Sequence, residues 1–242
     1  PKLLELYEAN NDIDRCNWNI APFTYTQSAG EGTPVDGREF VKGKRDEVEQ
    51  QYWDKSFSYG KTNPGSTYGD RESKNDANKN RNRAAAKYRR EYEADKKSKN
   101  DTSINFPLLR YSDILLMIAE AENEVNHGPN DLAYECINAV RERAGISKLQ
   151  ENLDETNFRE AIKDERAMEL CFEYTRRFDL IRWGDYYKLM QEQVSKAQTD
   201  ESWKFGINVY TYFNIPKSYN YFPIPANEIG SNGAIKTNNP GW

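Results

Sequence analysis

The chain has 242 residues, of which 30% are charged and 13% aromatic, and its formal net charge is −5. A negative net charge argues against nucleic acid or an anionic membrane surface as the main partner, because phosphate groups require a sustained excess of cations. The length allows one large domain or two small ones with a true hydrophobic core.

The first 105 residues are predicted to form a loop-rich, aromatic segment. A short helix-like start, LLELYEA, precedes sequence rich in Asn, Gly and Pro, whose turn signals favour irregular structure. Residues 70–101 are charged and of low complexity, which is typical of a solvated loop or a short helix. A nucleic-acid-binding arm is the alternative for that stretch, but acidic residues alternate with the basic ones and weaken it.

No stretch approaches the roughly 18 apolar residues of a membrane-spanning helix. The N-terminal sequence PKLLELYEANND also lacks the basic leader and the apolar segment of an export signal. We therefore expect the sequence to be a fragment of a mature protein whose true start, with any export signal, lies upstream.

The strongest helical pattern begins near residue 111 and predicts a helix over about 112–127. Ser112 is the expected N-cap, and the Gly-Pro pair at 128–129 ends the helix. Apolar residues recur there at helical spacing; they are Tyr111, Ile114, Leu115, Ile118 and Val125.

A second helix is predicted immediately afterwards, over about 130–144. Asn130 is its expected N-cap, and Gly145 stands at the position where helices commonly end. Its apolar stripe consists of Leu132, Cys136, Ile137 and Val140. The short connection makes the two helices antiparallel, which is the unit of helical-repeat solenoids, although the sequence shows one clear hairpin and no complete array.

A third helix is predicted over about 155–173, and its apolar face carries Glu165 and Glu169. The apolar positions are Phe158, Ala161, Ile162, Met168 and Phe172. A carboxylate on a buried face must be paired, because an unpaired buried charge is strongly destabilising. The sequence RRFDLIRWG, residues 176–184, closes this helix and supplies arginines nearby. We predict a structural ion-pair network whose members are Glu165, Glu169, Arg166, Arg177, Asp179 and Arg182.

After residue 184 the helical periodicity fades into sequence rich in aromatic residues and Asn. Pro216, Pro223 and Pro225 oppose regular helix in the C-terminal segment. We therefore expect an ordered but irregular covering there.

Most enzyme signatures are missing from the sequence. The sole histidine, His127, lies at a predicted helix end, where the helix dipole favours it as a C-terminal cap rather than as a catalytic base. No glycine-rich nucleotide motif or nucleophile elbow occurs. Glu165, Glu169 and Glu173 stand four residues apart, and glycoside hydrolysis requires two carboxyl groups. Neighbouring arginines would keep these groups ionised and unfit as general acids, so a structural role is favoured.

Neither a metal nor a cofactor is predicted. Asp12 and Asp14 weakly resemble the start of a calcium loop, but the glycine and the distal glutamate of such a loop are missing. A calcium site built from backbone carbonyls would leave no motif.

The odd number of cysteines excludes complete internal pairing, and Cys136 and Cys171 are interpreted as small buried residues rather than reactive thiols. The redox state of Cys16 and of the other two stays open.

Aromatic side chains gather in the predicted loops. Flat rings beside Asn, Asp and Arg are suited to sugars, because the apolar face of a pyranose stacks on the ring while its hydroxyls take the polar groups. Most of these rings are expected to serve packing. The candidates for ligand binding are Trp18, Tyr25, Tyr52, Trp53 and Tyr59.

From residue 106 onward, five motifs occur in the same order as in one protein family. They are FPLLRYSDILLMIAEAENE (106–124), CINAVRERAGI (136–146), FREAIKDERAMELCFEYTRRFDLIRWG (158–184), YFPIPANEI (221–229) and NNPGW (238–242). In these motifs the chain resembles the C-terminal half of the SusD/RagB family. The shared motifs are structural and transfer no ligand contact.

The resemblance implies a mainly α fold of the α-α superhelix type, with a tetratricopeptide-like helical hairpin and an irregular, loop-rich C-terminal region. Residues 106–242 would be the family's C-terminal region, residues 1–105 the expected ligand-facing part, and the N-terminal half of the family fold would be absent. Family members are nutrient-binding lipoproteins on the surface of the outer membrane of Bacteroidetes, where they cap a SusC-like, TonB-dependent transporter. The lipid anchor would lie outside this sequence.

The function implied is non-enzymatic capture of glycans, such as starch oligosaccharides, for import through that transporter. Three alternatives stay open. The protein could bind peptides or another nutrient, because a fold does not fix its ligand. The hairpin could serve as a protein-interaction scaffold, and a glycoside hydrolase is the remote enzymatic alternative.

Overall fold

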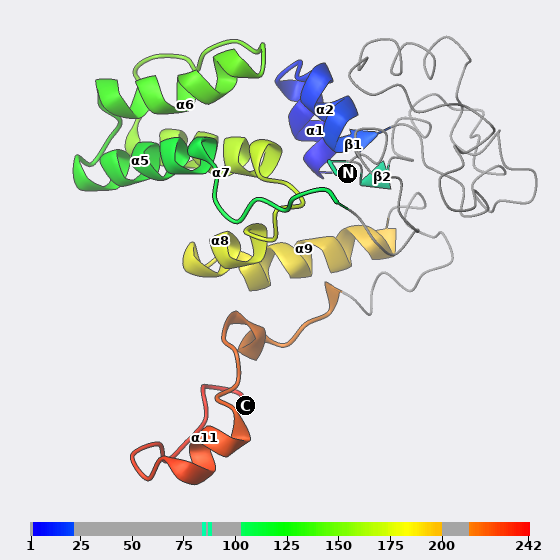
Figure 1. Ribbon diagram of the computed structural model, residues 1–242, viewed down its shortest axis with the longest axis vertical. Helices are drawn as coiled ribbons and strands as arrows, with labels where there is room; N and C mark the ends of the chain where they lie inside the picture. The colour runs from blue at the N-terminus through cyan, green and yellow to red at the C-terminus, as the bar shows by residue number, and fades with distance from the viewer. Residues whose placement is uncertain (1, 22–83, 86, 89–102, 200–212) are drawn as a thin grey trace, which may run out of the picture. The chain divides into compact units, whose positions relative to one another are not determined.

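The protein is described by a computed structural model that covers residues 2–21, 84–85, 87–88, 103–199 and 213–242 (Figure 1). The chain divides into two compact units, Pro1–Glu173 and Tyr174–Trp242. Helices dominate both units, as predicted. Among the described residues, no helix is both long enough and apolar enough to span a bilayer.

The first unit begins with α1 (Lys2–Ala9) and α2 (Ile13–Asn19), followed by strand β1 (Ile20–Ala21). Strand β1 pairs antiparallel with β2 (Ala84–Ala85), with Ile20 opposite Ala85. The sequence predicts a single short helix at this end of the chain, so α2 was not expected.

Helices α5 (Tyr111–Val125) and α6 (Asp131–Arg143) form the antiparallel hairpin. The side chain of Asn130 caps α6 by accepting a hydrogen bond from the Ala133 amide at 2.9 Å, as the sequence indicated. The prediction that Ser112 caps α5 is wrong, because α5 already begins at Tyr111, and the Ser112 hydroxyl accepts a hydrogen bond from Arg110 at 2.6 Å.

Gly145 ends α6 in the left-handed region, with φ of +77°. The amide of Gly145 donates to the carbonyl of Glu142, and the amide of Ile146 donates to the carbonyl of Arg141. This pair of hydrogen bonds satisfies carbonyl groups that the last turn leaves unpaired. The chain then turns back along α6 toward α7 (Glu155–Glu169).

The main core lies between α5, α6 and α7. Helical spacing directs one stripe of each helix into it; the buried members are Leu116, Ala119, Ala133, Cys136, Ile137, Val140, Phe158, Ile162 and Leu170. A second cluster packs α1 and α2 against α7 and consists of Leu4, Tyr7, Cys16 and Met168. Helix α7 is therefore buried against the hairpin and also against α1 and α2. All three cysteines are buried, and none of them forms a disulfide.

Four residues of the predicted apolar stripes face solvent instead of the core. Tyr111, Val125 and Leu132 are exposed because they lie in the end turns of α5 and α6, beyond the main core cluster. Phe172 is exposed as well, because α7 ends at Glu169 and Phe172 adopts a positive φ of 62°. The third helix is thus shorter than predicted.

The second unit contains α8 (Arg176–Arg182) and α9 (Tyr186–Thr199), separated by Gly184 at a φ of +77°. The sequence RRFDLIRWG therefore forms a helix of its own and does not close α7. Helix α9 was not predicted from the sequence. Among the described residues that follow, η5 (Lys217–Asn220) and α11 (Ala226–Ser231) are short helices.

The C-terminal motifs YFPIP and NNPGW bind to each other. Asn238 accepts a hydrogen bond from the Ile224 amide at 2.7 Å, and Asn239 donates one to the Phe222 carbonyl at 2.7 Å. The segment is ordered, as expected, but it is not wholly irregular: Pro225 stands at the N-cap of α11. A proline at a helix start loses no hydrogen bond, which is why it permits helix after it.

Candidate functional site

The first unit contains two candidate functional sites, a buried row of carboxylates and an open groove. The carboxylate row comprises Glu165, Glu169 and Glu173, which are exposed by 0%, 3% and 7% respectively. The first two lie in the last turns of α7, and the third follows the end of that helix. Burial of three formal negative charges requires cations close by.

Glu165 is held by arginines from two distant segments. Arg15 of α2 lies 2.6 Å from Glu165 Oε1, and Arg141 of α6 lies 2.8 Å from Glu165 Oε2. Arg15 also contacts Asp12 at 2.5 Å. Each carboxylate oxygen of Glu165 thus has its own charged donor, which is the arrangement that compensates best for burial.

Glu169 and Glu173 are held in the same way. Glu169 pairs with Arg15 at 3.0 Å, with Arg110 at 2.9 Å and with Arg143. Glu173 pairs with Arg110 at 2.8 Å and with Lys87. The row therefore ties α2, α6, the segment before α5 and the residues after β2 to α7.

The electrostatic consequence for Glu169 is that it stays ionised. Burial alone would raise the pKa of Glu169, but the charge of Arg143 and the hydrogen bonds from Arg110 and Arg143 outweigh it and lower the pKa to about 2. Burial would likewise lower the pKa of Arg15, yet Glu165 and Asp12 raise it above its ordinary value. A carboxyl group with such a pKa holds no proton at neutral pH and cannot act as a general acid.

The other predicted members of the network are placed elsewhere. Arg166 lies beside Asp113 of α5 at 2.8 Å. In the second unit, Arg182 pairs with Asp179 at 3.0 Å. Arg177 lies over the rings of Phe222, at 4.7 Å, and Tyr186, at 5.4 Å.

The cations that hold the row were missed from the sequence; they are Arg15, Lys87, Arg110, Arg141 and Arg143. One signal was available, because Arg141 stands four residues after Ile137 on the buried stripe of α6. A charged side chain at such a position must meet a partner. The remaining four carry no local pattern.

Of the five aromatic candidates, one is described. Trp18 lies on α2 and is half-buried. Tyr25, Tyr52, Trp53 and Tyr59 lie outside the described residues, so their role stays a prediction.

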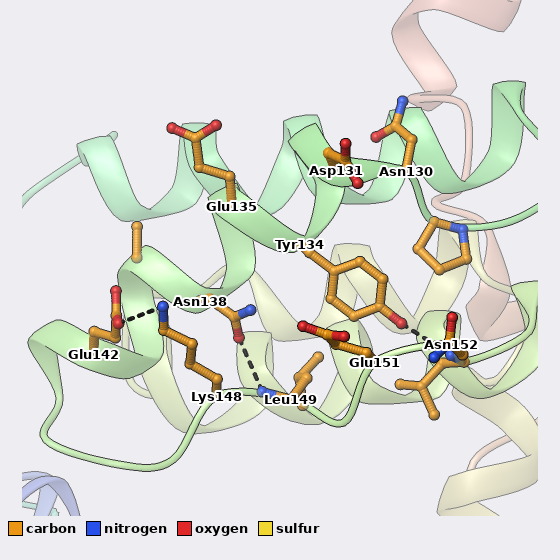
Figure 2. A pocket seen from close by; sticks show the side chains of 13 residues that line it. Asn130, Asp131, Tyr134, Glu135, Asn138, Glu142, Lys148, Leu149, Glu151 and Asn152 are labelled. Carbon is orange, nitrogen blue, oxygen red and sulfur yellow. Dashed lines mark hydrogen bonds and ion pairs between the residues drawn. The ribbon is translucent and has the colours of Figure 1, made fainter.

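The groove lies along the outer side of α6. Figure 2 shows residues 148–153 running beside this helix, joined to it by three polar contacts. The Lys148 ammonium lies 2.8 Å from Glu142, and the Leu149 amide donates to Asn138 at 2.9 Å. The Leu153 amide donates to the Tyr134 hydroxyl at 2.9 Å. We call this space, with a volume of about 720 Å³, the α6 groove.

Polar and acidic groups dominate the lining of the α6 groove. The acidic residues are Asp131, Glu135, Glu142 and Glu151. They do not form a metal site, because no group of His, Cys, Asp and Glu in the described ranges could hold a metal ion.

His127 lies just beyond α5, largely exposed, with a positive φ of 53° and a distant carboxylate of Glu155 at 3.8 Å. The exposed ring of His127 has no close carboxylate among the described residues to orient it, so its surroundings do not resemble those of a catalytic base.

The sequence and the fold are both similar to those of known proteins. The model of the SusD family matches residues 7–242. SusD-like protein P25 of Formosa agariphila is 38% identical over 136 residues, which are 55% of this chain and 23% of that protein. SusD-like protein P2 of the same organism is 30% identical over 149 residues, which are 59% of this chain and 27% of that protein.

A crystal structure of a SusD homolog from Bacteroides thetaiotaomicron matches the fold with a TM-score of 0.67 and 29% sequence identity. The match covers 100% of this chain and 43% of the solved chain. The chain spans about a quarter of the length of the curated relatives named above. Because the family model matches nearly all of the chain, the protein belongs to the SusD family.

Proposed function

We propose that this chain is part of a cell-surface protein that captures glycans for import through a SusC-like, TonB-dependent outer-membrane transporter. The observation that carries the proposal is the match of the SusD family model to residues 7–242. The chain covers less than half of its solved relative, so the complete binding site would draw on further polypeptide. Attachment to the outer membrane through a lipid on that further polypeptide is part of the proposal.

Capture without chemical conversion is the second part of the proposal. A retaining or inverting glycosidase requires one carboxyl group that holds a proton at working pH. Arg110 and Arg143 hold Glu169 as a carboxylate, with its pKa lowered to about 2. Glu165 is fully buried, and its two carboxylate oxygens are held by Arg15 and Arg141. These contacts support a structural role for the row.

The stacking platforms for the sugar are proposed to come from Trp18, Tyr25, Tyr52, Trp53 and Tyr59. Trp53→Ala should weaken binding by on the order of 1 to 3 kcal/mol if this ring is a central anchor. Unchanged affinity in that variant would remove Trp53 from the site.

Isothermal titration with plant, microbial and mucin oligosaccharides tests the proposal. We expect dissociation constants between micromolar and millimolar, without release of shorter products from a labelled polysaccharide. Cleavage that disappears in Glu165→Gln would contradict the proposal and indicate a glycosidase. Binding of peptides in the absence of glycan binding would assign a different nutrient. Silence of the full-length protein that contains this chain toward both classes would contradict nutrient capture.

A further inference from the structure

The α6 groove is a second place where a ligand could bind. It is lined by residues between 129 and 153, whereas the aromatic candidates lie in the first 105 residues of the sequence. Its volume of about 720 Å³ falls within the range of small-molecule sites in proteins. The groove is lined by α6 and by the segment that returns along it, within a single compact unit. Its shape is therefore set by local contacts.

Tyr134 forms a fixed aromatic wall of the groove. Its ring meets the buried Phe158 edge-on, with ring centroids 4.9 Å apart and planes at 66°. Its hydroxyl accepts a hydrogen bond from the Leu153 amide at 2.9 Å. Because both ends of the side chain are held, little rotational freedom would be lost when a ligand stacks on the ring. Flat rings of this kind accept the apolar face of a sugar or a cation.

The charge of the groove selects among ligands. Glu142 is paired with Lys148 at 2.8 Å. Asp131, Glu135 and Glu151 have no basic partner in the part of the chain that the structure describes. These three carboxylates repel anionic sugars and favour a cation. Figure 2 shows Glu151 beside the Tyr134 ring, and Asp131 farther away, above the ring in that view.

Asn138 adds a hydrogen-bond donor beside the ring. Its Oδ1 already accepts from the Leu149 amide at 2.9 Å, so the amide nitrogen is left to donate to a ligand. An aromatic wall, an amide donor and excess negative charge together match a sugar that carries a protonated amine.

We propose that the α6 groove binds an amine-bearing sugar, with its ring stacked on Tyr134 and its ammonium group facing Asp131 and Glu151. That the ligand is a sugar rests on the proposed glycan-binding function. That it carries a protonated amine rests on the negative charge of the groove itself. An anionic or neutral sugar of the same size would bind more weakly.

Titration of the 242-residue chain with the glucosamine trimer tests this assignment. We expect the trimer to bind about tenfold more tightly than the N-acetylglucosamine trimer, which has no charge, and the difference to shrink as salt is added. The double variant Asp131→Asn/Glu151→Gln should lose most of that preference. Glu160→Gln, an exposed carboxylate on α7 outside the groove, is the matched control and should keep it.

Each outcome decides between the two proposals. Equal affinity for the two trimers, or a preference that survives in the double variant, would overturn the groove assignment. If neutral glycans bind the chain but are unaffected by the double variant, and glucosamine binds no better, the proposed function stands while the groove assignment fails. If a Lys-Gly-Gly peptide binds as tightly as the glucosamine trimer, the groove recognises the amine alone, and the assignment of a sugar ligand is wrong. Thermal unfolding of each variant confirms that the chain is folded.

Discussion

Arg15 and Glu165 are 150 positions apart in sequence, yet a guanidinium nitrogen of Arg15 lies 2.6 Å from a carboxylate oxygen of Glu165. Both side chains are almost completely buried. The same nitrogen also reaches Glu169 at 3.0 Å. This one arginine therefore links α2 to two successive turns of α7.

Arg15→Met should destabilise the first unit strongly. The substitution leaves three buried carboxylates, those of Asp12, Glu165 and Glu169, without a shared cation, and breaking such a buried network costs about 3–5 kcal/mol. Urea unfolding followed by circular dichroism measures the change. Lys148→Met removes a surface pair with Glu142 and should change stability by less than about 1 kcal/mol. Similar losses in both variants would contradict a special role for Arg15.

The lowered pKa of Glu169 predicts that the free energy of unfolding decreases in acid. The pKa of Glu169 falls from an ordinary value of 4.5 to about 2 on folding, so the unfolded chain binds more protons between these values. The stability from this group is complete above about pH 4.5 and is lost as the pH falls toward 2. The depression corresponds to roughly 3 kcal/mol.

The difference between wild type and Glu169→Gln isolates this group from other titrating residues. The free energy of unfolding of the wild type should fall more steeply between pH 5 and pH 3 than that of the variant. Parallel curves for the two proteins would show that Glu169 does not carry the effect.

Tyr7→Phe should destabilise the packing of α1 on α7. Burial raises the pKa of Tyr7, so its hydroxyl stays protonated and donates to the Met168 carbonyl at 2.6 Å. The hydroxyl also accepts from Asn19 at 2.8 Å. Loss of a buried donor and acceptor is expected to cost about 1–3 kcal/mol in unfolding experiments. No change would indicate that Asn19, which also reaches the Met168 carbonyl, compensates fully.

Gly241→Ala should release the C-terminal tryptophan. Gly241 has a φ of +88°, and a Cβ there would lie 2.6 Å from Cβ of Ser218. The Trp242 ring stacks on Tyr219 at 5.3 Å, and its indole N–H donates to the Ser218 carbonyl at 3.1 Å. Hydrogen exchange of that indole N–H, followed by NMR, should become faster in the variant. Gly233→Ala has free space around the added carbon and is the matched control.

The three helices between residues 111 and 169 were predictable because their signals are local. Apolar residues repeat with the period of a helix, and Asn130 and Gly145 provide a cap and a stop within a few residues of the pattern. Errors arose where local signals compete. Ser112 is a good N-cap residue, but its hydroxyl is taken by Arg110, and α5 begins one residue earlier.

The candidate sites were less predictable. The sequence showed that Glu165 and Glu169 lie on a buried face and require cations, but the neighbouring Arg166 lies beside Asp113 instead. Tyr134 carried no signal as a groove residue, because the groove exists only where residues 148–153 return along α6.

The sequence by itself determined the helical hairpin, the buried carboxylates and the family motifs, since periodicity, caps and ordered motifs are properties of neighbouring residues. Only the tertiary structure decided which cations neutralise the row and which side chains enclose the α6 groove. Pairing of charges depends on distance in space, and segments as far apart as Arg15 and Glu165 meet only after the helices pack.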